Sequence, residues 1–519
     1  MLISEKRPGT LWGWFPWACL GGATIIGILT LYRGAFGDEA DNLAVGALVR
    51  EGYALYRDVF SHHFPLPYYW MAVVVAICGR SLFAARFSIL LLHMGAFALP
   101  MALNRERLAL GLAALGWGLL RLFYRGNMVL YSSFCAPALA VVFVLTLGLL
   151  TERRPPRWAE LALVGLAGAF AILSDPLAIY ATAIALVSLF IQHPRRGWAA
   201  AGVCALAGGA ALGALAVAGT LDDFWREAIL FNAQVYGKYL DTNPVRLKEL
   251  AKMALTALEF FDRAWWHADP RRPISTQYTQ FDQWVFTGLL YRAACLALTA
   301  FLAWRRQWRA AAFAYLFAAA TLVINKWDFR GQPFVLTAII ALMLVLTGLY
   351  QALPSHRTAR VAGLSLGVGL ALMAAWLGLR LGFSLVSSRQ SLSPQTFRPW
   401  REQAEQMLSL SCHHPEARLG IYPGGGSIYT YFFSGMKPVS RYVFMWPWVA
   451  EMGLEEVIGA LDQEGTMALV VRQEAVIWER YDTRVYLRPL DEFLQTHYVP
   501  VGEGMYRSPA LEAFCHAQK

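Results

Sequence analysis

The sequence has little charge for its length. Only 15% of its 519 residues are Asp, Glu, Lys or Arg, 57% are hydrophobic, and the mean hydropathy is +0.42. A soluble globular protein carries about 25% charged residues, so this chain lacks the polar surface of a soluble protein of its size. Its apolar residues form many separate runs of about 20, the length at which an α-helix crosses a bilayer. We therefore expect a polytopic α-helical membrane protein.

Motifs for metals and nucleotides are also scarce. The 7 cysteines include no CxxC pair and no metal-ligand spacing. The glycine run at 424–426 lacks the Lys and the helix context of a phosphate-binding loop, so it predicts a turn. Cys412 and Cys515 both lie in a polar C-terminal segment, where a disulfide can form if the segment is exported; the sequence does not show whether they meet.

Basic residues recur in every second loop between the apolar runs. The net charge of +10 therefore does not indicate nucleic acid as a partner, because cytoplasmic loops of membrane proteins are enriched in Lys and Arg. The clusters are Arg105/Arg107, Arg153/Arg154/Arg157, Arg195/Arg196, Arg305/Arg306/Arg309 and Arg357/Arg360. This alternation predicts about 11 spans, from 11–32 to 361–381, with the N-terminus inside and the C-terminus outside.

One apolar segment is too short for a crossing. Residues 67–78 begin with Tyr and Trp side chains, which favour the membrane–water interface. Counting this segment as a span would place all five basic clusters outside, so we predict a helix lying in the interface.

The polar segments define the expected domains. Residues 1–384 would form a transmembrane catalytic domain with exoplasmic loops at 34–82 and 219–283, the second of which begins with an amphipathic helix. Residues 385–519 alternate predicted strands (417–422 and 467–471) with predicted helices (400–410 and 449–463), which indicates a small exoplasmic α/β domain.

The segment 37–70 is the candidate site. Asp38, Glu39 and Asp41 directly follow the first span, and acidic groups at the mouth of a span predict a functional site. In a helix, Asp38 shares a face with Asp41 and Asn42, while Glu39 lies about 100° away, where it could meet a cation. The alternative is that these carboxylates only stabilise a helix N-terminus.

Other polar residues are expected on the same outer surface. These candidates for substrate binding are Arg57, His62, His63, Tyr131, Asp175, Lys326 and Arg330. Arg330 is the favoured phosphate ligand because it precedes the tenth span and guanidinium binds phosphate in a bidentate manner; the alternative is an interfacial anchor. Asp175 precedes Pro176 and could instead cap a helix.

A family resemblance rests on the order of short motifs. Asp38-Glu39 after the first span is followed by Tyr56-Arg57-Asp58, His63-Phe64-Pro65 and Tyr69-Trp70. The next span opens on Ala-Arg-Phe at 85–87, and 429–444 reads YTYFFSGMKPVSRYVF. This order resembles the polyprenyl-phosphate-sugar glycosyltransferases of the C superfamily, which include protein O-mannosyltransferases and lipid A aminoarabinose transferases.

The resemblance implies an activity. It implies inverting transfer of a sugar from a polyprenyl-phosphate carrier, at the outer face of the cell membrane, to a glycan, lipid or protein acceptor. Asp38 matches the base of the family, and Glu39 would assist or orient it. Several relatives carry a second Asp where this chain has Tyr131, which puts the acceptor or the base arrangement in doubt.

Other functions stay open. A transporter or flippase for a lipid-linked substrate would also expose polar groups at a membrane mouth, although the charges here gather at one side rather than at mid-membrane. A non-catalytic assembly protein is the third reading. No metal site is assigned, but Asp38, Glu39 and Asp41 have the oxygen ligands that a divalent ion prefers.

Overall fold

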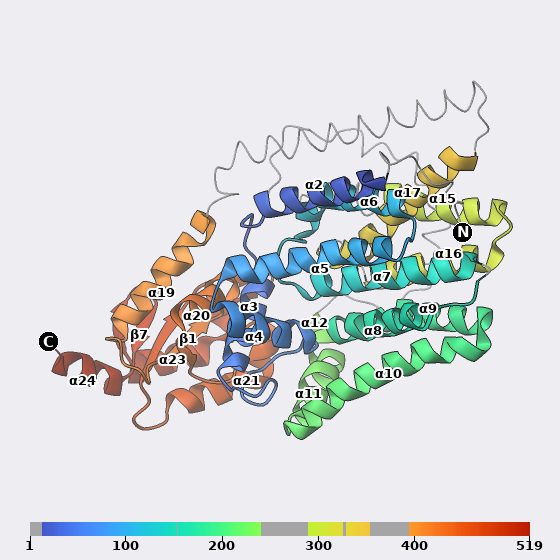
Figure 1. The fold of residues 1–519 in the computed structure, drawn as a ribbon. Helices are drawn as coiled ribbons and strands as arrows, with labels where there is room; N and C mark the ends of the chain where they lie inside the picture. The colour runs from blue at the N-terminus through green and yellow to red at the C-terminus, as the bar shows by residue number, and fades with distance from the viewer. Residues whose placement is uncertain (1–12, 153, 240–288, 325–328, 353–393, 519) are drawn as a thin grey trace. The chain divides into compact units, whose positions relative to one another are not determined.

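The computed structural model describes residues 13–152, 154–239, 289–324, 329–352 and 394–518 (Figure 1). Within them the chain forms two compact units, which are described separately. Unit 1 takes its described residues from Met1–Gly34, Arg86–Ala211 and Asn243–Ser393, and unit 2 takes its own from Ala35–Ala85, Leu212–Thr242 and Pro394–Lys519.

Unit 1 is helical throughout its described part. Its elements are α2 (Phe15–Leu29), most of α5 (Leu82–Ala102), α6 (Arg107–Leu120), η1 (Arg121–Tyr124), α7 (Tyr131–Thr151), α8 (Trp158–Ser174), α9 (Ala178–Gln192), most of α10 (Pro194–Val217), α15 (Leu289–Trp304), α16 (Trp308–Ile324), η5 (Phe329–Gly331) and α17 (Gln332–Ala352). Four helices in the described residues are long and apolar enough to cross a membrane: Leu82–Ala102, Tyr131–Thr151, Pro194–Val217 and Gln332–Tyr350.

These helices fit the expected spans. A helix lies at every predicted span that falls within the described residues, whereas the span at 361–381 lies outside them. The chain is an integral membrane protein with a mostly helical fold. The number of crossings and the direction of each remain predictions.

The core of unit 1 is apolar and closely packed. α7 is buried along nearly its whole length and packs against α8, α9, α16 and α17. α2 and α6 approach each other at glycines: a Cβ on Gly111 would lie 2.6 Å from Pro16 Cα, and one on Gly118 would lie 3.0 Å from Ala23 Cα. Small residues permit this approach between membrane helices.

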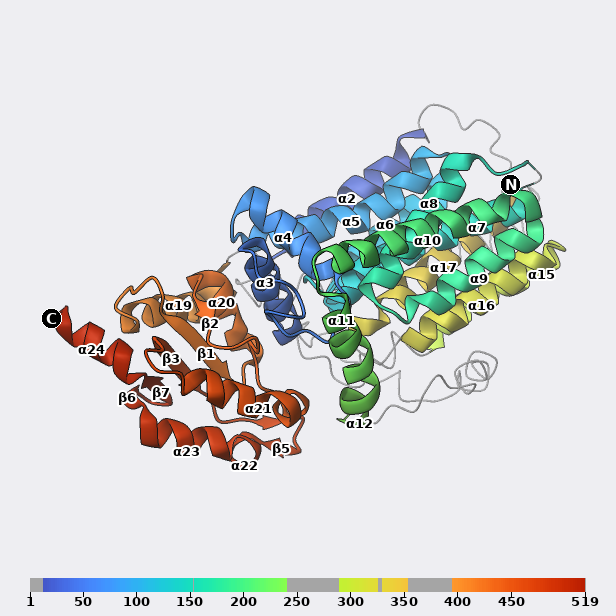
Figure 2. The same cartoon turned by 90° about the horizontal axis from the view of Figure 1, so that it is seen from below.

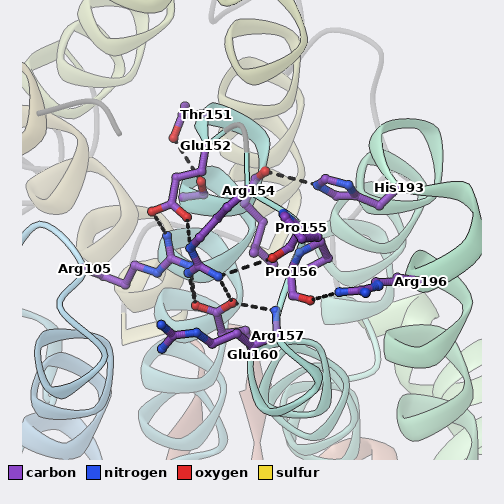
Figure 3. Close-up of polar contacts among 12 residues, drawn as sticks. Arg105, Thr151, Glu152, Arg154, Pro155, Pro156, Arg157, Glu160, His193 and Arg196 are labelled. Atoms are coloured by element: carbon purple, nitrogen blue, oxygen red, sulfur yellow. Dashed lines mark hydrogen bonds and ion pairs between the residues drawn. The ribbon is translucent and has the colours of Figure 1, made fainter. Parts of the chain in front are cut away.

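Four of the basic loops meet at one end of unit 1. Arg105 forms ion pairs with Glu152 and Glu160, and Arg154 bonds both carboxylates as well (Figure 3). Arg196 donates to the carbonyl of Pro156 at 2.7 Å, while Arg309 donates to Gln192 Oε1 at 2.6 Å. Grouping at one end is what helices alternating in direction would produce, so it supports the predicted topology.

Buried polar side chains bond the carbonyl groups at and just after the C-terminal end of α2. Arg121 donates to the carbonyl oxygen of Gly27 in the last turn of α2 at 2.9 Å, a group that lacks a partner within the helix. In the segment after the helix, Arg86 donates to the carbonyl oxygens of Leu31 and Gly34, each at 2.8 Å, and Asn127 Nδ2 donates to Arg33 O at 2.7 Å. The chain that leads from α2 to the acidic segment is thereby held in place.

Unit 2 combines the acidic segment with the C-terminal region. Its helices are α3 (Gly37–Arg50), α4 (Leu66–Cys78), α11 (Leu221–Phe224), η2 (Trp225–Leu230), η3 (Asn232–Tyr236), α12 (Gly237–Tyr239), η6 (Pro394–Phe397), α19 (Arg398–Leu410), η7 (Gly425–Ile428), α20 (Tyr429–Ser434), α21 (Pro447–Leu461), α22 (Thr483–Tyr486), α23 (Arg488–His497) and α24 (Pro509–Ala517). The 13 residues of α4 span about 20 Å, less than a hydrocarbon core of about 30 Å, which supports the predicted interfacial helix.

A mixed sheet forms the centre of the C-terminal part. Its strands are β1 (Arg418–Tyr422), β2 (Lys437–Pro438), β3 (Ala468–Arg472), β6 (Val499–Gly502) and β7 (Met505–Arg507), in the order β2-β1-β3-β7-β6, with a separate hairpin of β4 (Val476–Ile477) and β5 (Tyr481–Asp482). Helices lie on both sides of this sheet (Figure 2).

The expected elements of the C-terminal segment are present. β1 and β3 pair in parallel and lie where strands were predicted, and α19 and α21 lie at the two predicted helices, although α21 begins and ends before the predicted bounds of 449–463. Cys412 and Cys515 form a disulfide, with Cα atoms 5.7 Å apart, that joins the end of α19 to α24. The domain boundary at residue 384 stays a prediction.

The described start of the long loop is helical from Leu221 to Tyr239. Trp225–Leu230 and Asn232–Tyr236 have π-helical hydrogen bonding, a wide and uncommon geometry that is often found at functional sites. Phe224, Ala228 and Phe231 are buried, whereas Trp225 is 56% exposed. The segment is therefore an amphipathic helix with an irregular backbone.

Candidate functional site

The acidic turn that opens α3 is anchored to α20. Glu39 is fully buried, and its Oε2 accepts a hydrogen bond of 2.5 Å from the Tyr429 phenol. The same phenol oxygen accepts the N–H of Phe36 at 3.3 Å, so Tyr429 also holds the residue before the helix. Asp38 is half-buried beside Glu39. Glu39 points to a phenol here, a partner that sequence reasoning did not anticipate.

Close contact between α3 and α4 determines what surrounds Asp41. A Cβ on Gly46 would lie 2.4 Å from Met71 Cβ and 3.1 Å from Tyr68 O, so only glycine allows this approach. Tyr68 then donates its hydroxyl hydrogen to Asp41 Oδ2 at 2.9 Å, and Ser61 Oγ donates to Tyr68 at 2.7 Å.

Asp41 is more buried than its position in sequence suggests. Its side chain is 6% exposed, and Oδ1 has no hydrogen-bond partner in the described part of the chain. Burial, together with the charge of Asp38, raises the pKa of Asp41 to about 7, against the lowering effect of Tyr68. The two carboxyl groups therefore influence each other, as expected for neighbours on one helix face.

A second buried carboxylate joins the π-helical segment to the same network. Glu227 accepts the N–H of Ser61 at 3.2 Å through Oε2 and forms an ion pair with Arg441 through Oε1. Burial raises the pKa of Glu227 to about 8, although Arg441 opposes this shift. Arg441 also donates to the carbonyl of Tyr56. These contacts join three separate stretches of unit 2.

The two predicted histidines lie within this aromatic part of unit 2. The rings of His62 and His63 are 4.1 Å apart, and His62, which is 7% exposed, lies 4.8 Å from the ring of Tyr236. The carbonyl of His62 accepts from Asn232 Nδ2 at 2.6 Å, which fixes the turn against the π-helical segment.

Arg57 has a local ion-pair partner. Its Nε donates to Asp58 Oδ1 at 3.0 Å, and half of the Arg57 side chain is exposed. Asp58 in turn accepts the N–H of Ala54 at 2.9 Å, so the pair stabilises its own turn. To bind a phosphate, Arg57 would have to give up its ion pair with Asp58.

The remaining candidates belong to unit 1. Tyr131 opens α7 and is buried. Asp175 follows α8, and its Oδ1 accepts the N–H of Leu177 at 2.9 Å, within the turn that precedes α9. Arg330 lies in η5 and acts electrostatically on Asp175. Lys326 lies outside the described residues.

Among the described residues, no three His, Cys, Asp or Glu side chains stand together in a way that could hold a metal ion. The residues that sequence reasoning missed are Tyr68, Glu227, Tyr429 and Arg441, together with the burial of Asp41. The early signals were the motif at 429–444, which contains Tyr429 and Arg441, and the aromatic start of residues 67–78, which contains Tyr68.

Comparisons with known proteins identify the fold. No family model matches the sequence, and no curated protein matches it. Among solved structures, ArnT from Cupriavidus metallidurans in the apo state has a TM-score of 0.54 at 12% identity, over 96% of this chain and 98% of its own. The same protein bound to undecaprenyl phosphate has a TM-score of 0.58 at 13% identity, over 97% and 99%. The chain therefore has the fold of ArnT, which agrees with the fold that the resemblance of its motifs implied.

Proposed function

We propose that the protein transfers a sugar from a polyprenyl-phosphate carrier to an acceptor hydroxyl at the outer face of the cell membrane. The observation that carries this proposal is the fold shared along nearly the whole chain with an ArnT structure that holds undecaprenyl phosphate. The Cys412–Cys515 disulfide supports an oxidising, exported location for the C-terminal part of unit 2.

Asp38 is the proposed general base. It lies in the first turn of α3, where the helix dipole favours an ionised carboxylate, and it is only half-buried, so an acceptor can reach it. The carboxylate takes the proton of the acceptor hydroxyl while the acceptor oxygen bonds to the anomeric carbon. The bond from that carbon to the phosphate oxygen breaks, and polyprenyl phosphate leaves with both electrons. General base catalysis of this kind contributes about 10²–10⁴-fold.

Glu39 is proposed as an orienting residue. Its Oε2 is occupied by the Tyr429 phenol, so Glu39 is committed to holding α3 in place beside Asp38. Arg330 is the proposed ligand of the departing phosphate, because a guanidinium stabilises the charge that develops on it. Arg57, His62, His63, Tyr131, Asp175 and Lys326 are proposed as further substrate contacts.

The test is release of polyprenyl phosphate by the purified full-length protein in detergent, with polyprenyl-phosphate sugars as donors and extracted membrane lipids, glycans or proteins as acceptors. We expect release by the wild type and loss of at least 100-fold in Asp38→Asn, the lower bound expected for a general base. Asp462→Asn is the matched control, because Asp462 is an exposed carboxylate at the end of α21. Near-normal release of polyprenyl phosphate by Asp38→Asn would show that Asp38 is not the general base.

The same preparation distinguishes the other functions. A flippase reconstituted in liposomes would move the lipid-linked sugar across the bilayer and release no polyprenyl phosphate. An assembly protein would do neither. Either result would replace the proposed reaction.

A further inference from the structure

Asp41 is a buried carboxyl group that the proposed reaction does not use. It lies one helical turn after Asp38, on the same face of α3. Its Oδ2 accepts from Tyr68, whereas Oδ1 has no partner in the described residues. A buried carboxylate oxygen that receives no hydrogen bond makes the ionised form costly, so this environment favours the neutral acid.

The groups around Asp41 have opposing effects on its ionisation. Tyr68 of α4 donates a hydrogen bond to Asp41, and Ser61 donates a hydrogen bond to the hydroxyl oxygen of Tyr68. On α3 itself, the neighbouring charge is that of Asp38, which disfavours a second negative charge. The acidic neighbour Glu39 is engaged by Tyr429 of α20. In the described part of the chain, we find no cation paired with Asp41 that would lock it in the ionised form.

Two further charged groups, Glu227 and Arg441, are connected to Ser61. Glu227, from the π-helical segment, accepts the N–H of Ser61, and Arg441 pairs with Glu227. Among the described residues, hydrogen bonds link Glu227 to Asp41 through Ser61 and Tyr68, so Glu227 and Arg441 position these hydroxyl donors rather than neutralise the carboxyl group.

We infer that Asp41 is a positioning residue that sets the base strength of Asp38 through its own charge. This inference rests on the proposed function. When Asp41 is neutral, Asp38 is the weaker base. When Asp41 loses its proton, a second negative charge on the same helix face makes Asp38 a stronger base, and the transfer step accelerates.

The ionisation falls near neutral pH. Burial and Asp38 raise the pKa of Asp41 to about 7, so the accelerating charge appears as the pH rises through this value. If the added charge strengthens Asp38 by one pKa unit, and half of that gain reaches the transition state, kcat rises about 3-fold.

The first experiment follows kcat and KM for polyprenyl phosphate release from pH 5.5 to 8.5 in the purified full-length protein. We expect kcat of the wild type to rise about 3-fold near pH 7, with KM unchanged. Asp41→Asn, which keeps the shape of the neutral acid, should stay at the low-pH level, and Asp41→Glu should restore the rise. A wild-type inflection retained in Asp41→Asn, or complete loss of activity in a folded Asp41→Asn protein, would overturn the inference.

Tyr68→Phe provides a second test of the inference if Asp41→Asn does not fold. It removes the hydroxyl that stabilises ionised Asp41, so the inflection should move to higher pH without disappearing. An unchanged inflection in Tyr68→Phe contradicts the inference. Tyr498→Phe is the matched control, because Tyr498 is buried but donates to the carbonyl of Leu461.

A readout without catalysis separates this inference from the proposed function. The infrared absorption of protonated carboxyl groups is titrated, and the difference between wild type and Asp41→Asn isolates Asp41. Asp38→Asn should lower the midpoint of this difference, because the neighbouring charge is gone. If the midpoint of the Asp41 titration does not move in Asp38→Asn, the two carboxyl groups are not coupled, even if sugar transfer is observed. If the midpoint moves but the wild type releases no polyprenyl phosphate, the proposed function is wrong and the coupling between Asp38 and Asp41 is retained.

Discussion

The phenol of Tyr429 donates a hydrogen bond of 2.5 Å to Oε2 of Glu39, across 390 residues of sequence. This contact attaches the helix that carries the acidic turn to α20, next to the C-terminal sheet. Both residues are fully buried, so water does not compete for the hydrogen bond.

Tyr429→Phe is expected to lower both stability and activity. A hydrogen bond to a charged group contributes about 1.5–3 kcal/mol, and its loss leaves buried Glu39 without this donor. The free energy of unfolding and the rate of polyprenyl phosphate release should fall together. In the control Tyr498→Phe, only the stability should fall. A Tyr429→Phe protein with wild-type stability would show that the contact does not support α3.

Asp41 is expected to give the fold a pH dependence. Its pKa in the folded protein, about 7, lies above the ordinary value of 3.8, so the folded state binds the extra proton between these values. The stabilisation is fully present below about pH 4 and is lost as the pH rises to about 7, with a slope approaching about 1.4 kcal/mol per pH unit. Chemical unfolding at several pH values should show this slope, and Asp41→Asn should remove it. An equal slope in both proteins would contradict the burial of Asp41.

Glu227 and Arg441 are expected to be strongly coupled. Arg441→Ala leaves the carboxyl group of Glu227 buried without its cation, a change that costs about 3–5 kcal/mol in comparable buried pairs. Glu227→Gln in the same chain should recover much of this loss. A double-mutant cycle on the free energy of unfolding measures the coupling, and additive losses would mean that the two side chains act independently.

The ion-pair cluster of unit 1 should be sensitive to removal of one acid. Glu160 is 1% exposed and bonds both Arg105 and Arg154, so Glu160→Gln leaves Glu152 as the one carboxylate paired with the two guanidinium groups in the described part of the chain. We expect a loss of about 3–5 kcal/mol. Glu492→Gln in the exposed pair with Arg488 should cost less than about 1 kcal/mol. Equal losses in the two variants would contradict a buried cluster.

The predicted topology can be checked by fusion. A reporter inserted after Arg154 should be active only on the cytoplasmic side, because positive charge retains such loops inside. A reporter at the C-terminus should be active only outside. Activity of the Arg154 fusion on the outer side would invert the predicted spans.

Local features of the chain were predictable because local physics determines them. Short apolar stretches that alternate with helix signals marked the strands that became β1 and β3, and length and hydropathy marked the helices of unit 1. The acidic turn at Asp38 and Glu39 was also singled out from local sequence, because carboxylates at the mouth of a membrane span are costly and predict a functional site.

The surroundings of the acidic turn could not be predicted, because long-range packing creates them. Tyr429 is 390 residues from Glu39, and Glu227 is 166 residues from Ser61. Nothing local distinguishes Asp41 from an ordinary carboxylate near a helix N-terminus. Its burial follows from the contact between Gly46 and α4.

The distance in sequence between Glu39 and Tyr429 has a consequence for biogenesis. A ribosome makes the chain from its N-terminus, and segments fold as they emerge. The helix with the acidic turn is therefore synthesised first, and the phenol that anchors it follows 390 residues later. A nascent chain that stops before Tyr429 lacks this hydrogen bond to Glu39, so the surroundings of the acidic turn are complete only after Tyr429 has been synthesised.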